Sequence, residues 1–67
     1  MISTTNPRAV VLTQTVSVDG FEQVVALLVN PESKLILHRL TRWSKRGAVS
    51  DIASWAVGKR IEIVQVT

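Results

Sequence analysis

The chain has 67 residues, enough for one small domain, and 46% of them are apolar against 19% charged. It contains no cysteine and a single histidine, which excludes disulfides, thiolate metal sites and zinc sites built on two imidazoles. The net charge of +3 is a mild excess, compatible with nucleic acid, an acidic protein surface or no charged partner.

The hydropathy pattern argues against a membrane partner. The longest uninterrupted apolar run, 24–29, is far shorter than the roughly 20 residues of a spanning helix. The N-terminal residues lack the basic start and apolar stretch of a signal peptide. We therefore expect a soluble, intracellular, cytoplasmic protein.

Residues 1–8 are polar and without periodicity, so we expect a flexible lead-in to a single domain over 9–67. That domain opens with an alternating segment. The even positions of 9–18 carry one apolar face, interrupted only by Gln14: Val10, Leu12, Val16 and Val18. The odd positions carry a more polar face: Val11, Thr13, Thr15 and Ser17. This period of two, rich in β-branched residues, predicts a half-exposed strand.

Asp19-Gly20 follows directly and predicts a tight hairpin, because a type I′ turn needs positive φ at both central residues. The second strand would then span 21–29. A helix over 20–29 with Asp19 as N-cap is the alternative, since several apolar residues also have helical spacing. The turn chemistry favours the strand.

The segment 30–33 contains Pro31 and predicts a turn. A third strand is expected over 34–43, apolar on both faces in its first half and basic in its second. The segment 44–47 is polar and basic, and it is expected to be a loop.

A short helix is expected over 51–57. Ser50 would be its N-cap, and Asp51 would lie in the first turn, where its charge suits the helix dipole. Gly58 would end the helix in the left-handed conformation. One stripe of this helix is expected to pack on the sheet: Ile52, Trp55 and Ala56.

A closing strand over 60–66 completes the order β-β-β-α-β. Its alternation changes phase at Ile63-Val64, which indicates a bulge or a strand covered on both faces. The chain is therefore predicted to be α+β and β-rich, with a small antiparallel sheet or a partly open barrel. Three strands are apolar on both faces in places, more than one short helix covers, so we expect a homodimer or larger homo-oligomer.

The residues that catalysis requires do not come together in the sequence. His38 lies in an apolar strand without a flanking acid, and the five carboxylates are scattered. The three glycines stand alone, so no phosphate-binding loop is formed. We expect a protein that is not an enzyme and uses no metal or cofactor.

The one local concentration of charge lies between Lys34 and Arg46, where five cations occur without an acid. The candidate nucleic-acid-binding residues in this segment are Arg39, Arg42, Trp43, Lys45 and Arg46. Cations beside an aromatic ring suit a phosphate backbone with a base stacked on the ring. A solvated edge strand would carry similar charges, and Trp43 would equally suit the core or a subunit contact. The pair Lys59-Arg60 would extend the patch if it folded nearby.

These features favour a small nucleic-acid-binding or regulatory protein that acts without catalysis through a basic, Trp-containing patch. The alternatives are a protein-binding module, such as a small inhibitor or adaptor of a larger machine, and a structural subunit of a homo-oligomer. Binding to nucleic acid would depend steeply on salt, whereas a protein adaptor would be indifferent to DNA and RNA.

Overall fold

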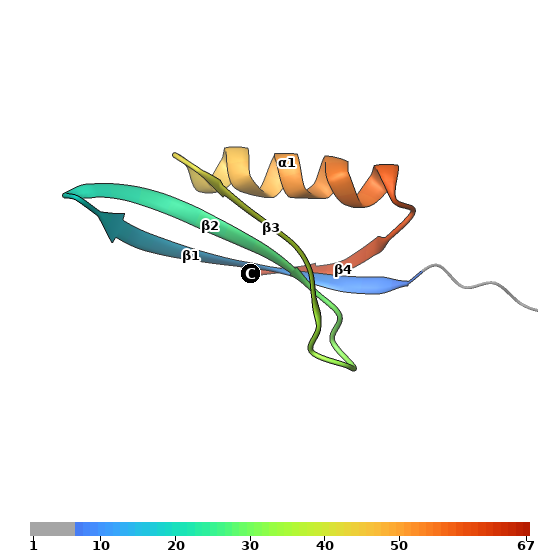
Figure 1. Cartoon of the computed structure of the whole chain (residues 1–67). Coiled ribbons are helices and arrows are strands. Elements are labelled where there is room, and N and C mark those ends of the chain that lie inside the picture. Colours follow the sequence, from blue (N-terminus) through green and yellow to red (C-terminus); the bar gives the residue numbers. More distant parts are fainter. Residues whose placement is uncertain (1–6) are drawn as a thin grey trace, which may run out of the picture.

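The computed structural model describes residues 7–67, which form four strands and one helix. In chain order these are β1 (Arg8–Val18), β2 (Phe21–Val29), β3 (Ile36–Arg42), α1 (Lys45–Gly58) and β4 (Glu62–Val66). The strands form one sheet in the order β3-β2-β1-β4, and α1 lies across one face of it (Figure 1). The predicted α+β class and element order are confirmed, and the sheet is open and not a closed barrel.

The sheet is mixed. Strand β2 pairs with β1 and with β3 in antiparallel fashion, whereas β4 runs parallel to β1. The expected lead-in ends earlier than predicted, because Arg8 already belongs to β1; residues 1–6 lie outside the described residues. No helix within 7–67 is long and apolar enough to cross a membrane.

The hairpin between β1 and β2 has the predicted two-residue turn. Asp19 and Gly20 both adopt positive φ, at 51° and 81°, and Val18 pairs directly with Phe21. This is the backbone signature of a type I′ turn, whose twist matches that of the flanking strands. The strand over 21–29 is therefore confirmed, and the helical alternative is wrong.

The connection between β2 and β3 is organised by Asn30. Its side-chain Oδ1 accepts hydrogen bonds from the N–H groups of Glu32 at 2.9 Å and Ser33 at 3.0 Å. Its backbone carbonyl accepts one from the N–H of Lys34, which adopts a φ of 66°. An asparagine that bonds to the backbone just ahead of it stabilises a turn locally. Because Lys34 is part of this turn, β3 begins at Ile36 and not at residue 34 as predicted.

Helix α1 is longer than predicted and begins where a loop was expected. Ser44 is the N-cap: it has extended backbone angles, and its Oγ accepts the N–H of Gly47 at 3.1 Å. The prediction of a loop over 44–47, with Ser50 as N-cap and Asp51 in the first turn, is wrong. One buried stripe runs the length of the helix with a spacing of four residues: Ala48, Ile52 and Ala56. Burial of this stripe against the sheet extends the helix by two turns beyond the prediction.

The C-terminus of α1 also differs from the prediction, because Arg60 and not Gly58 adopts the left-handed conformation, with φ at 59°. The N–H of Arg60 donates to the carbonyl of Val57, and the N–H of Ile61 donates to the carbonyl of Ala56. These two bonds are the Schellman pattern that satisfies the last carbonyls of a helix. They turn the chain back toward β4.

Strand β4 contains the predicted irregularity. Ala9 pairs with Ile63, but the next residue of β1, Val10, pairs with Gln65, so Val64 is an extra residue in β4. This bulge accounts for the change of phase in the sequence.

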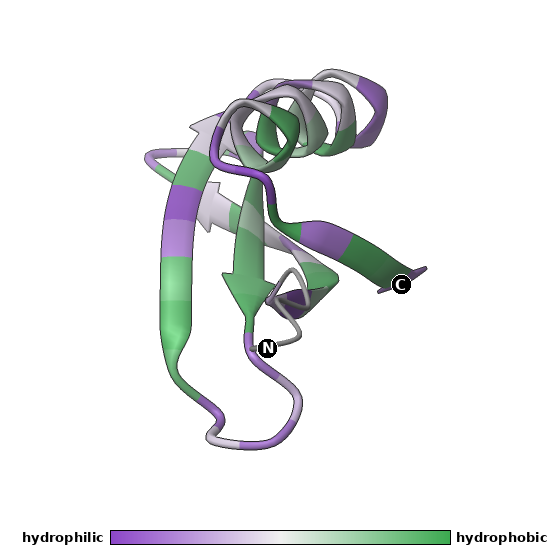
Figure 2. Ribbon diagram, turned by 90° about the vertical axis from the view of Figure 1, so that its right-hand side faces the viewer, coloured by the Kyte–Doolittle hydropathy of each residue, from purple (hydrophilic) through white to green (hydrophobic). Residues whose placement is uncertain are grey.

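The core lies entirely between α1 and one face of the sheet. It consists of eight buried residues: Ala9, Val11, Val24, Ala26, Leu28, Ala48, Ile52 and Ala56. On β1 the buried residues occupy odd positions, so the apolar even positions point to the opposite face. Figure 2 shows α1 on one side of the sheet, and no helix or strand of the described chain covers the other side.

Substitutions at two glycines with open space around them can test the backbone strain of the turn without an effect of side-chain packing. A Cβ at either Gly20 or Gly58 would meet no atom within 4 Å, but only Gly20 has positive φ. We expect Gly20→Val to lower the free energy of unfolding by about 1–2 kcal/mol, since a β-branched residue resists that conformation. Gly58→Ala should instead raise it by up to about 1 kcal/mol. Urea denaturation measures both, and equal effects would contradict the assigned turn.

The position of the N-cap can be tested with two serines. Ser44→Ala removes the acceptor for the N–H of Gly47 and should cost about 1 kcal/mol of folding stability. Ser50→Ala, in the interior of α1 and exposed, should change stability by less than about 0.5 kcal/mol. The reverse order of the two effects would place the helix start at Ser50.

Candidate nucleic-acid interface

The five predicted site residues lie on two faces of the molecule. Trp43 connects β3 to α1, and Lys45 and Arg46 are the first two residues of the helix. Together with Arg42, the last residue of β3, they form what we call the β3–α1 corner. Arg39 lies apart from it: Arg39 pairs with Leu27 of β2 on the sheet face away from α1.

Strand alternation is the reason that the two arginines of β3 separate. Arg42 pairs with Val24 of β2, which is buried in the core beneath α1. Paired residues share a sheet face, and residues three apart in a strand point to opposite faces. The pairing register therefore puts the two arginines, which were expected in one patch, on opposite faces of the sheet.

Arg42 is bound to the helix by an ion pair. Its Nε lies 2.6 Å from Oδ2 of Asp51, and its Nη1 donates to the carbonyl of Thr41 at 2.8 Å. The side chains of Arg42 and Asp51 are 46% and 50% exposed, so the pair contributes at most about 1 kcal/mol. Its larger effect is electrostatic, because Asp51 offsets one of the positive charges at the corner.

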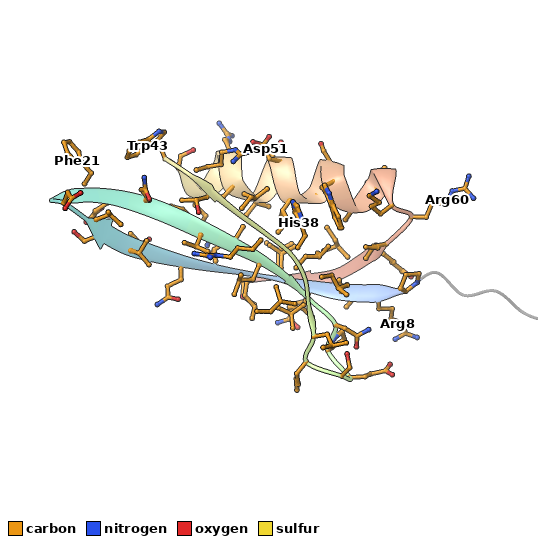
Figure 3. All side chains as sticks on the ribbon, in the orientation of Figure 1. Arg8, Phe21, His38, Trp43, Asp51 and Arg60 are labelled. Carbon is orange, nitrogen blue, oxygen red and sulfur yellow. The ribbon has the colours of Figure 1, made fainter. Side chains whose placement is uncertain are left out.

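Trp43 is 70% exposed, so it does not anchor the core. Figure 3 places it at the same end of the molecule as Phe21, which is 65% exposed. A large exposed aromatic ring is available for stacking on a base or packing against a protein.

Lys45 and Arg46 occupy the end of α1 at which positive charge is least favourable. The first turn contains no acidic residue, although the helix dipole places about half a positive charge there and favours anions. The side chains of Lys45 and Arg46 are both exposed. Two cations and the dipole therefore combine at one point of the surface, an arrangement that attracts phosphate.

Lys59 and Arg60 do not join the corner. They follow the C-terminus of α1, a helix of 14 residues that is about 21 Å long, and Figure 3 shows Arg60 at the end opposite Trp43. Enlargement of the patch by these two cations is therefore excluded by the fold.

Trp55 and His38 have a structural role between β3 and α1. Their rings stack with centroids 4.0 Å apart and planes 4° apart, and Nζ of Lys59 lies 5.7 Å from the centroid of the Trp55 ring. Trp55 is partly buried against the core, which confirms the prediction that it packs on the sheet.

The described residues form no pocket and contain no cluster of three or more His, Cys, Asp or Glu residues that could hold a metal ion. No family model, no curated protein and no solved structure matches this chain.

The two tryptophans should respond to substitution in opposite ways. Trp55→Ala removes the stack on His38 and contacts with the core, and it should cost roughly 3 kcal/mol, the low end for a tryptophan because the ring is only partly buried. Trp43→Ala should change the free energy of unfolding by no more than about 0.5 kcal/mol. Chemical denaturation measures both values, and a large loss of stability for Trp43→Ala would contradict a free ring at the corner.

Proposed function

We propose that the protein binds nucleic acid, without catalysis, at the β3–α1 corner. The observation that carries the proposal is the exposed ring of Trp43 immediately before a helix whose first two residues are Lys45 and Arg46. An aromatic plane for a base thus adjoins cations and a helix N-terminus for a phosphate.

The exposed ring favours single-stranded nucleic acid. A base stacks on Trp43 only if it has left its own stack, and bases in a duplex are held in place by pairing and stacking. In this mechanism Trp43 takes a base, while Lys45 and Arg46 neutralise adjoining phosphates. Arg42 contributes less, because its guanidinium is already paired with Asp51. Arg39 lies on the other face and is not part of this contact.

The number of cations at the corner determines how strongly nucleic acid is expected to bind. With two phosphate contacts, the logarithm of the binding constant should fall with the logarithm of the salt concentration at a slope of about 1.4 on a single strand, at about 0.7 per contact. Such a surface binds weakly at physiological salt unless several copies act on one strand.

The test is a titration of labelled single strands and duplexes by fluorescence anisotropy at two salt concentrations. Replacing Lys45 and Arg46 with Gln should abolish most of the salt slope, and Trp43→Ala should cost roughly 1–3 kcal/mol of binding free energy. The matched control replaces Lys59 and Arg60 with Gln, which removes the same charge from the far end of α1 and should retain binding. Absence of binding at low salt, or an equal loss in both double variants, would refute the proposal.

A protein-binding module is the second candidate, and the exposure of both Phe21 and Trp43 at one end of the molecule favours it. Aromatic residues are enriched at protein interfaces. A small inhibitor or adaptor of this kind would retain its partner at salt concentrations that remove nucleic acid, and nuclease treatment would not release it.

A further inference from the structure

The sheet face opposite α1, which we call the open face, is apolar along β1 and β2. Five cross-strand pairs lie on it, from Val10–Val29 at one end to Val18–Phe21 at the tip of the hairpin. None of these ten side chains is charged, and Gln14 and Gln23 are the only polar ones.

At the tip of the hairpin, the two faces of the sheet differ in residue type. On the helix side, beyond the core, the side chains are polar and exposed: Thr15, Ser17 and Glu22. On the open face of the same segment they are Val16, Val18 and Phe21, and the last two are exposed. Because the helix-side residues here are polar and exposed, the apolar residues of this segment lie on the open face, which no helix or strand of residues 7–67 covers.

The size of the open face fits a contact between two sheets. At about 3.3 Å per residue and about 4.8 Å between strands, β1, β2 and β3 present roughly 30 Å by 14 Å. Flat projection gives roughly 400 Å² per copy, or roughly 800 Å² for two copies. The accessible area of a pleated surface exceeds its projection, which brings the total toward the roughly 1,000 Å² of a specific interface.

We propose that the open face packs against the open face of a second copy of this chain, forming a two-fold dimer with α1 on the outside of each sheet. Such a contact is isologous, so the face must complement itself. Its central pairs are uncharged, which lets two copies that each carry a net charge of +3 approach. The charged Arg39 lies at the β3 side, on the rim.

The two amides favour a protein surface such as a second copy over nucleic acid or a bilayer. Gln14 pairs with Val25 and Gln23 with Val16, so the amides are diagonal neighbours in the middle of the face. Neither has a side-chain hydrogen-bond partner among the described residues. An amide both donates and accepts, so the same pair on a second copy satisfies it. Nucleic acid would call for cations here, and a bilayer would leave the amides unpaired.

The first experiment is sedimentation equilibrium of the full chain. A dimer of twice 7.4 kDa is expected. Leu12→Arg places a charge in the open face and should raise the dimer dissociation constant by about 100-fold or more. The matched control, Val57→Arg on the exposed side of α1, should leave the constant unchanged. Far-UV circular dichroism of each variant verifies the fold.

A second measurement decides the proposal even if Leu12→Arg fails to fold. The chain has no cysteine, so Gln14→Cys and Thr15→Cys place single thiols at adjacent exposed positions on opposite faces. A short bismaleimide should cross-link Gln14→Cys into a covalent dimer and leave Thr15→Cys monomeric.

A monomeric mass up to millimolar concentration, or equal cross-linking of the two cysteine variants, overturns the proposal. If the open face serves a different protein or a bilayer, the isolated chain gives that monomeric result. The outcome is independent of nucleic-acid binding, because Leu12 lies outside the β3–α1 corner.

Discussion

The contact between one stripe of α1 and one face of the sheet is the interaction on which the rest of the molecule depends. Ala48, Ile52 and Ala56 are fully buried there, against partners such as Val11 and Leu28. Two of the three helix residues are alanines, and side chains of that size let a helix lie close to a sheet. With so few large side chains in the core, small errors in this packing are costly.

The same contact determines where the charged groups lie. Because the buried stripe starts at Ala48, the helix must begin by Ser44, and Lys45 and Arg46 are carried into its first turn. The helix then ends at Gly58, about 21 Å away, so Arg60 belongs to the opposite end of the molecule. The division of the basic residues into two groups is thus a consequence of core packing.

Local chemistry made part of this fold predictable. Asp19-Gly20 specifies its turn through backbone conformation alone, so the hairpin and both of its strands could be inferred without knowledge of the rest. The start of α1 could not, because cations and a glycine after Ser44 resemble a loop, and burial of Ala48 against distant strands outweighs that preference. Alternation along β1 likewise separates two faces but does not say which one the helix covers.

In the candidate site, too, some features follow from the local sequence and others depend on tertiary packing. The local run of cations was visible in the sequence, but it was expected to form one patch, whereas alternation along β3 puts Arg39 and Arg42 on opposite faces. The ion pair of Arg42 with Asp51 depends on how α1 crosses β3, and the exposure of Trp43 depends on where β3 ends. Both are tertiary properties that residue types and spacing do not encode.

The parallel pairing of β4 with β1 has a consequence for how the chain reaches this structure. β1 and β2 are joined by two residues and can pair early, whereas β4 returns to β1 from more than fifty residues away, as in the pairing of Arg8 with Glu62. During synthesis β4 leaves the ribosome after its partner is already part of a hairpin. Until then one edge of β1 has no partner strand, and its unpaired N–H and carbonyl groups can pair with a strand of another chain. Edge-to-edge pairing with another chain is therefore possible at β1 until β4 has been made.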